Sequence, residues 1–217
     1  MMSWFKRDQG TFRPAKKVGP EHRGYKLQQI SQATLGTGDV RGAVVLPPGE
    51  NLNDWLAVSV VDFFNQISCL FAPVAEYCTP DTCKEMTAGP AYKYAWQDTE
   101  KYKKPTSLPA NEYIANVMIW TEKYINNEKY FPSDPSVPFP DDFQNIVKNI
   151  FKRLFRIYAH LYHHHIDDIS KVGADAHLNT SFRHFVVFAK EFKLIPEEQL
   201  APLKDIIDTC MASLDKK

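Results

Sequence analysis

Two pairs of metal-ligand residues, far apart along the chain, constrain the fold more than any other feature of the sequence. Cys78 and Cys83 are separated by four residues, and so are His160 and His165. Two thiolates and two imidazoles at these spacings are typical of a tetrahedral Cys₂His₂ zinc site. Four protein ligands leave no position for water or substrate. The sequence therefore predicts one structural Zn²⁺ that joins two distant segments.

The sequence does not determine which histidine is the second histidine ligand. His160 and His165 are five positions apart, which on an ideal helix turns the second ring by about 140° from the first. His164 would share a face with His160. Either the helix ends or distorts near His163, or the second ligand is a different residue. Spacing alone does not choose among His163, His164 and His165.

Composition limits the class of protein. The chain has 217 residues, of which 44% are hydrophobic and 24% charged, as is ordinary for a globular protein with one large core. We expect no membrane insertion, because no apolar run approaches the length of a membrane-spanning helix. Four cysteines are too few for a disulfide framework, and Cys69, within an apolar run, is expected to be a buried thiol. These features favour a reducing, intracellular setting.

Charge is balanced overall but unevenly distributed. Basic and acidic residues number 26 each, so the net charge is zero and the chain is not expected to bind nucleic acid. Residues 1–25 are basic and lack apolar periodicity, which predicts a flexible arm before a single domain over residues 26–217. No basic residue lies between Arg41 and Lys84. Separate patches of both signs favour protein partners.

Apolar periodicity predicts an all-α fold, a helical bundle with a small β-hairpin and the structural zinc site. A short helix is expected over Lys26–Leu35, followed by a loop to residue 50. Asn51 is expected to cap a long helix whose apolar stripe runs from Leu52 to Leu70. The other predicted elements are helices over Ala110–Asn126, Phe143–Leu161, Thr180–Phe192 and Pro196–Leu214, and a hairpin between Tyr92–Trp96 and Lys103–Leu108.

Two charged groups are candidate binding sites. Lys152, Arg153 and Arg156 are three or four residues apart on one predicted helix, with no acidic residue between Asp142 and Asp167 to pair with them. A solvated helix face is one interpretation, and a phosphate site is the other, since guanidinium groups can each donate two hydrogen bonds to a phosphate.

The acidic residues at the start and on the polar side of the helix after Asn51 form either a solvated face or a groove for a basic helix. They are Glu50, Asp54 and Asp62.

Several stretches of the sequence resemble the Mob (Mps-one-binder) family, in the kinase-activating class that partners NDR/LATS-type kinases. The similarity runs from about Thr11 to Leu203. The matching stretches are Ala33–Gly36, Asp54–Val58, Val61–Ile67, Met86–Pro90, Val137–Pro140, Lys152–His160 and Ala176–Phe182.

The resemblance implies a helical fold, one structural zinc and a coactivator that is not an enzyme. The implied zinc ligands are Cys78, Cys83, His160 and His165, and the glutamine that is usual in the family at position 164 argues against His164. The implied phosphothreonine pocket consists of Lys152, Arg153 and Arg156. The implied kinase-docking surface consists of Glu50, Asp54, Trp55 and Asp62, with His184 nearby. The implied regulatory phosphorylation sites are Thr11 and Thr34.

The implied partners are the basic N-terminal segment of an NDR/LATS-type AGC kinase and a phosphorylated Ste20-like upstream kinase or scaffold. The resemblance further implies that the protein is a monomer. Its implied location is the cytoplasm, with the nucleus and the spindle pole or basal body as further locations, and its implied roles are in Hippo signalling, mitotic exit and cytokinesis. We also expect the basic arm to cover the acidic groove until phosphorylation releases it.

Two alternatives stay open. One is a phocein-like scaffold of striatin–phosphatase assemblies, which would not bind NDR kinases. The other is a zinc hydrolase, against which a fully occupied Cys₂His₂ set argues. No nucleophile–base pair, phosphate-binding glycine loop or pair of catalytic carboxylates stands out in the sequence.

Overall fold

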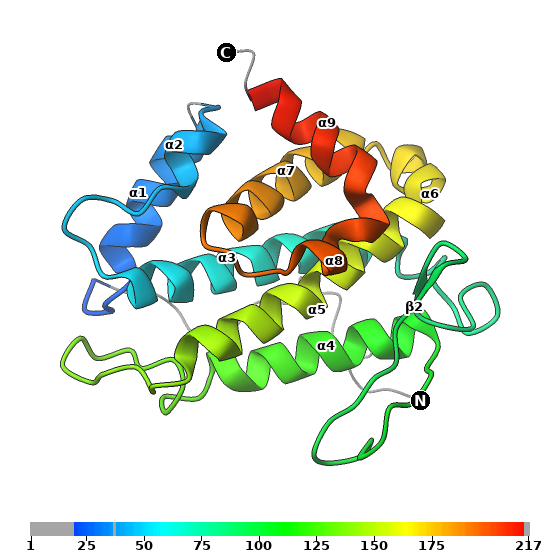
Figure 1. Cartoon of the computed structure of the whole chain (residues 1–217), viewed down its shortest axis with the longest axis horizontal. Coiled ribbons are helices and arrows are strands. Elements are labelled where there is room, and N and C mark those ends of the chain that lie inside the picture. The colour runs from blue at the N-terminus through cyan, green and yellow to red at the C-terminus, as the bar shows by residue number, and fades with distance from the viewer. Residues whose placement is uncertain (1–19, 37, 215–217) are drawn as a thin grey trace.

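A computed structural model describes residues 20–36 and 38–214 of the chain. Its centre is α3 (Leu52–Phe71), which packs against α4 (Ala110–Ile125), α5 (Phe143–His164) and α7 (Asp175–Glu191), as Figure 1 shows. Phe63 on α3 contacts α5 and α7 through its ring, whose centroid lies 5.6 Å from that of Phe151 and 5.2 Å from that of Phe185.

The start of α3 is fixed by the predicted cap. Oδ1 of Asn51 accepts hydrogen bonds from the backbone N–H groups of Asn53 (2.8 Å) and Asp54 (3.3 Å), which have no partner within the helix. Together with η1 (Ala72–Val74), α3 is long and apolar enough to cross a membrane, which the sequence expectation overlooked. However, 56% of its most apolar window is buried inside the molecule, as in the core helix of a globular domain. Cys69 is exposed, contrary to prediction, because it falls on the outward face of this helix.

Two short helices precede α3 and lie together beside the bundle: α1 (Tyr25–Gly36) and α2 (Val40–Val44) (Figure 1). The first was predicted, whereas α2 falls in the expected loop. Asp39 caps it by accepting from the N–H of Gly42 at 2.9 Å. Five residues are too few to show helical periodicity, which explains why it was missed.

The end of the predicted arm contacts the domain. The backbone N–H of Arg23 donates to the carbonyl oxygen of Ser133 at 3.2 Å. The rest of the arm, including Thr11, lies outside the described residues.

A small hairpin is present, as predicted, but its two strands are not the predicted pair. The two strands β1 (Thr87–Ala88) and β2 (Tyr92–Lys93) pair antiparallel across a turn in which Gly89 has φ +67°. The expected partner segment contributes only the single bridge between Trp96 and Thr106. The predicted fold class, a helical bundle with a small β-hairpin, is confirmed.

The C-terminal third contains more helical segments than predicted. A short helix α6 (Ile166–Lys171) follows α5 directly, and α7 begins at Asp175 rather than Thr180. The predicted last helix is divided into α8 (Glu197–Leu200), the 3₁₀ turn η2 (Ala201–Leu203) and α9 (Lys204–Leu214). The division occurs at Pro202, which has no N–H to donate and disfavours a continuous helix.

Candidate functional site: a metal cluster and two charged surfaces

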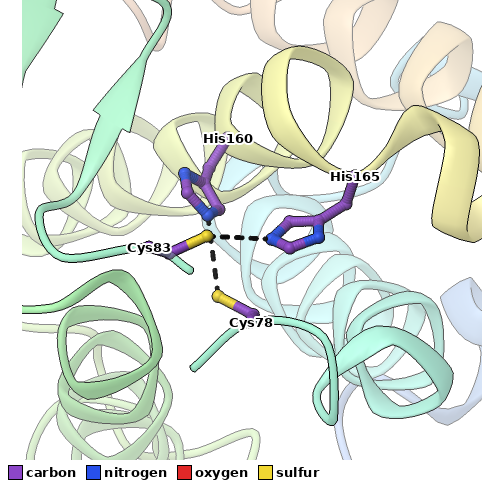
Figure 2. Close-up of side chains that lie close together, drawn as sticks. All are labelled: Cys78, Cys83, His160 and His165. Carbon is purple, nitrogen blue, oxygen red and sulfur yellow. Dashed lines mark hydrogen bonds between the residues drawn. The ribbon is translucent and has the colours of Figure 1, made fainter. Parts of the chain in front are cut away.

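The four predicted metal ligands converge in one buried cluster (Figure 2). Cys78 and Cys83 lie in the loop after η1, while His160 and His165 lie at the end of α5, and their ligand atoms are all within 4.8 Å of one another. Sγ of Cys78 is 3.6 Å from Nε2 of His160, and Sγ of Cys83 is 3.4 Å from Nε2 of His165. Both cysteines are free thiols, so the cluster could hold a metal ion.

The end of α5 explains how His165 reaches the cluster. The helix stops at His164, and His165 has non-helical dihedrals, with φ −129° and ψ 14°, before α6 begins. The ideal 140° rotation therefore does not apply across this break. His163 instead approaches the carbonyl oxygen of Pro202 through Nε2 at 2.9 Å, and Nε2 of His164 lies 2.9 Å from Oγ1 of Thr87. The structure thus assigns the fourth position to His165.

Hydrogen bonds on the far side of each imidazole orient the cluster. Nδ1 of His160 lies 2.8 Å from the carbonyl oxygen of Thr87, and Nδ1 of His165 lies 3.1 Å from a carboxylate oxygen of Asp168. Such partners fix the ring tautomer and turn Nε2 toward the site of the metal. Burial lowers the pKa of His160 to about 3, which keeps the ring in the neutral form that binds metals. Burial and the neighbouring Cys83 raise the pKa of the Cys78 thiol, an effect that a bound cation would reverse.

Arg153 does not extend into solvent as a helix-surface arginine would. Its guanidinium carbon lies 4.2 Å from the ring centroid of Trp96 and 4.4 Å from that of Trp120, so it is held against two indoles. Nη2 donates to the carbonyl oxygen of Gln97 at 3.2 Å. Burial lowers the pKa of Arg153 from its ordinary value, so a nearby anion would be stabilising.

Arg156 is held in a similar aromatic setting. Its Nη1 donates to the hydroxyl oxygen of Tyr113 at 2.7 Å, and its guanidinium carbon lies 4.9 Å from the ring centroid of Tyr94. Nε of Arg156 and Nη1 of Arg153 are buried and have no hydrogen-bond partner within the described part of the chain. Unpaired buried donors are unfavourable, so an acceptor from outside the protein would be bound favourably here.

Lys152 lies on the other side of Arg156. It lines a groove with Lys148, Lys190 and Lys193 rather than the cavity that Arg153 lines. The three predicted residues therefore do not form one solvated basic face. On an ideal helix, however, Arg156 projects between the directions of Lys152 and Arg153.

The acidic surface, defined here as Glu50, Asp54 and Asp62, is covered by the segment that precedes and begins α1. Nε of Arg23 donates to Asp54, Nζ of Lys26 lies 2.5 Å from a carboxylate oxygen of Glu50, and Nε2 of Gln28 lies 3.5 Å from Oδ1 of Asp62. The predicted acidic residues are thus brought together, and each already contacts a donor from the same chain.

Trp55 and His184 are both buried, which corrects the expectation that Trp55 is part of the docking surface. Trp55 is 1% exposed and donates from Nε1 to the carbonyl oxygen of Val44 at 3.1 Å. His184 is 6% exposed, and its ring centroid lies 4.7 Å from that of Phe63. Burial lowers the pKa of His184 to about 4, so the ring is neutral. Trp55 belongs to α3 and His184 to α7, so both side chains lie in the core between these two helices.

Asp62 gives the acidic surface a measurable pH dependence. Burial raises its pKa from 3.8 to about 6, and the hydrogen bond from Gln28 offsets only part of this. The unfolded chain therefore loses this proton at lower pH than the folded protein. Stability then falls as the pH rises from about 4 to about 6, and the loss persists above that range. We expect Asp62→Asn to raise the free energy of unfolding by about 2 kcal/mol at pH 7.5 and by less than about 1 kcal/mol at pH 4.5.

Denaturant unfolding at the two pH values measures this difference. Asp205→Asn is the matched control, because Asp205 is exposed on α9 and its replacement should change the free energy of unfolding by less than about 0.5 kcal/mol. A benefit of Asp62→Asn that is the same at both pH values would show that ionisation of Asp62 is not its cause.

The chain is similar in sequence to known proteins over most of its length. The Mob1/phocein family model matches residues 32–203. This chain belongs to the Mob1/phocein family. The Mob resemblance seen in the sequence is therefore confirmed.

Similar proteins come from plants and an amoeba. "MOB kinase activator-like 1B" of Medicago sativa subsp. falcata is 49% identical over 203 residues, which cover 94% of each chain. "MOB kinase activator-like 1A" of Arabidopsis thaliana is 48% identical over 206 residues, covering 95% of this chain and 96% of the relative. "MOB kinase activator-like 1 homolog A" of Dictyostelium discoideum is 46% identical over 210 residues, covering 97% and 99%. Kinase activators of this kind are regulatory proteins rather than catalysts.

The aromatic residues that contact Arg153 and Arg156 could not be identified from the sequence. Tyr94 and Trp96 follow β2, whereas Tyr113 and Trp120 lie on α4. No periodic pattern links these positions to α5. The only signal was the alternation of Tyr92–Trp96, which indicated a strand but not what its side chains contact.

Proposed function

We propose that this protein is a kinase activator that acts as an adaptor and not as an enzyme. Its family membership and the names of its relatives support this role. The observation that carries the proposal is the acidic surface, which binds basic side chains of the same chain and so has the chemistry to bind those of a partner. The closed Cys₂His₂ cluster gives no support to the hydrolase alternative.

The proposed kinase ligand is the basic N-terminal segment of an NDR/LATS-type AGC kinase. It would bind Glu50, Asp54 and Asp62, and to do so it would displace the donors that now contact them. The ion pair of Lys26 with Glu50 is easily exchanged, because the lysine is 73% exposed and such pairs contribute only about 0–1 kcal/mol. Residues 23–28 would thus compete with the kinase in cis.

Phosphorylation of α1 would weaken this competition. Oγ1 of Thr34 donates to the carbonyl oxygen of Ile30 at 2.9 Å, a bond that a phosphate ester would remove. The phosphate would also place about −1.5 to −2 charges in the last turn of α1, where negative charge is unfavourable. Thr11 is proposed as a second site on the grounds of resemblance.

One negative charge added to α1 should weaken its contact with the acidic surface. Gln28→Glu would place a second carboxylate beside Asp62, because the two side chains are 3.5 Å apart. We expect this variant to bind a basic kinase peptide about fivefold more tightly at pH 7.5, since close like charges disfavour the covered state by roughly 1 kcal/mol. Isothermal titration measures the affinity.

Gln29→Glu is the matched control for that variant. Gln29 is exposed on the same helix, so the substitution adds the same charge without facing Asp62. Its affinity for the kinase peptide should equal that of the wild type. Equal affinities for Gln28→Glu and Gln29→Glu would mean that α1 does not compete with the kinase.

We propose zinc as the ion of the Cys₂His₂ cluster. Zinc–sulfur bonds of about 2.3 Å and zinc–nitrogen bonds of about 2.0–2.1 Å in a tetrahedron place sulfur and nitrogen roughly 3.6 Å apart. The observed separations of 3.6 and 3.4 Å are close to this.

We propose that the site formed by Lys152, Arg153 and Arg156 binds phosphothreonine, supplied by a Ste20-like upstream kinase or a phosphorylated scaffold. The buried, unpaired donors of the two arginines support an anionic ligand. Affinity purification distinguishes this account from a phocein-like scaffold, which would recover striatin–phosphatase assemblies instead of NDR-type kinases.

A further inference from the structure

A groove with unbalanced positive charge adjoins the phosphothreonine site. It measures about 560 Å³ and is lined by Lys148 and Lys152 of α5 and by Lys190 and Lys193 at the end of α7. Glu197 is the one carboxylate among its lining residues, and it pairs with Lys190 at 2.8 Å. The other three lysines have no ion-pair partner among the residues that the structure describes. The groove therefore favours an anionic ligand.

Lys193 stands at a backbone position where helices usually have glycine. Its φ is +50°, in the left-handed region. The N–H of Lys193 donates to the carbonyl oxygen of Lys190 at 3.2 Å, and that of Leu194 donates to Ala189 at 2.9 Å. These two bonds form the Schellman motif, in which glycine avoids the steric penalty of a side chain. The helix end does not require this lysine, whose side chain adds charge to the groove.

We propose that the groove binds a second acidic group of the same peptide whose phosphothreonine binds Arg153 and Arg156. This inference rests on the proposed phosphothreonine function. Lys152 links the two sites, since it lines the groove and belongs to the phosphothreonine pocket. Lys148 precedes Arg156 by eight positions on α5, about 12 Å along the helix axis. An extended peptide spans that length in about four residues.

The ligand is therefore a peptide that carries aspartate, glutamate or a second phosphorylated residue about four positions from its phosphothreonine. A peptide fits the groove better than a lipid surface does. The groove is a recess between two helices, and the buried Leu194 and Ile195 contribute to its lining. A membrane surface would require the cations to project beyond the protein.

Calorimetric titration of matched peptides tests the proposal. One peptide carries phosphothreonine with neutral flanks, and two others add a pair of aspartates four residues before or after it. A fourth replaces the better-placed aspartates by phosphoserine, to separate carboxylate from phosphate recognition. We expect one aspartate peptide to bind the wild type about tenfold more tightly than the neutral peptide, as two ion pairs would provide.

The decisive variant is Lys148→Gln/Lys193→Gly, which leaves the pair of Lys190 and Glu197 intact. This variant should bind the aspartate peptide no more tightly than the neutral phosphopeptide, and its affinity for the neutral phosphopeptide should equal that of the wild type. Because glycine suits the left-handed position, its melting temperature should not fall, and we expect a rise of about 2 °C. Lys84→Gln/Lys129→Gln removes the same charge from exposed positions outside the groove and should retain the gain.

Several results would overturn the proposal. In one, the wild type binds the acidic peptides no more tightly than the neutral phosphopeptide. In another, Lys148→Gln/Lys193→Gly still binds an acidic peptide more tightly than the neutral one. In the third, the control variant loses the added affinity for acidic peptides to the same extent as the groove variant. A groove variant that changes only binding to phosphatidylserine vesicles would assign the groove to lipid instead. If the neutral phosphopeptide binds no better than its unphosphorylated form, the proposed phosphothreonine function itself fails, which is a distinguishable outcome.

Discussion

Replacing Cys83 by serine is expected to abolish stoichiometric zinc binding and to lower the melting temperature sharply. The cluster joins the loop after η1 to the junction of α5 and α6, so loss of the metal separates two segments that are distant in sequence. Structural zinc contributes roughly 10–16 kcal/mol to the folding of zinc-finger peptides, and we expect a loss on the order of 5 kcal/mol here. For a chain of this length, that corresponds to a fall of roughly 10–20 °C. Elemental analysis and thermal unfolding measure the two effects.

Cys69→Ser provides the matched control. It makes the same chemical change at an exposed position of α3 that is not part of the cluster. That variant should keep one zinc per chain and the melting temperature of the wild type. Full zinc content in Cys83→Ser, or a metal-free wild type of undiminished stability, would show that the cluster is not a structural zinc site.

The second large effect is expected at the arginine site. Arg153→Gln/Arg156→Gln should weaken binding of a phosphothreonine peptide by at least about a hundredfold, because each charge-assisted hydrogen bond contributes roughly 1.5–3 kcal/mol. The substitution also removes the guanidinium groups that lie over the rings of Trp96 and Tyr94, whereas glutamine keeps an amide that can still donate hydrogen bonds. Thermal unfolding checks that the variant is folded. Calorimetry with phosphorylated and unphosphorylated peptides measures the affinity.

Lys101→Gln/Lys123→Gln is the control for charge alone. Both lysines line the cavity beside Arg153, so the variant removes the same net charge close to the site. We expect it to weaken phosphopeptide binding by less than about threefold, as is usual for exposed charges. Equal affinity of the wild type for both peptides, or equal losses in the two double variants, would refute the phosphothreonine site.

The long helices were predictable because each carries a continuous apolar stripe. In α3, α4 and α5 this stripe recurs over four or more turns, and the capping residue Asn51 marks the start of the first. Residue types and spacing also predicted three metal ligands. The fourth ligand, His165, depends on the break after His164, where the backbone leaves the helical conformation. Apolar periodicity does not predict the position of such a break.

The remaining features depend on contacts between distant segments. Nothing in the local sequence of Arg153 indicates that Trp96 and Trp120 enclose it. The contact of Arg23 with Asp54 likewise joins a predicted arm to a helix. Charge complementarity suggested that the arm would cover the acidic surface, but only the packing of α1 on α3 identifies which residues meet.

We propose that the acidic surface activates a kinase by binding its basic N-terminal segment. The most direct measurement is titration of an NDR-type kinase with this protein, with binding and kinase activity followed in the same samples. The variant Glu50→Lys/Asp62→Lys reverses the charge of the surface, and Glu198→Lys/Asp205→Lys makes the same change at exposed positions on α8 and α9. We predict that the wild type and the second variant bind and activate the kinase, with an affinity that falls as salt is added, and that the first variant does neither. Unchanged binding and activation by Glu50→Lys/Asp62→Lys, or no binding by the wild type, would contradict the account.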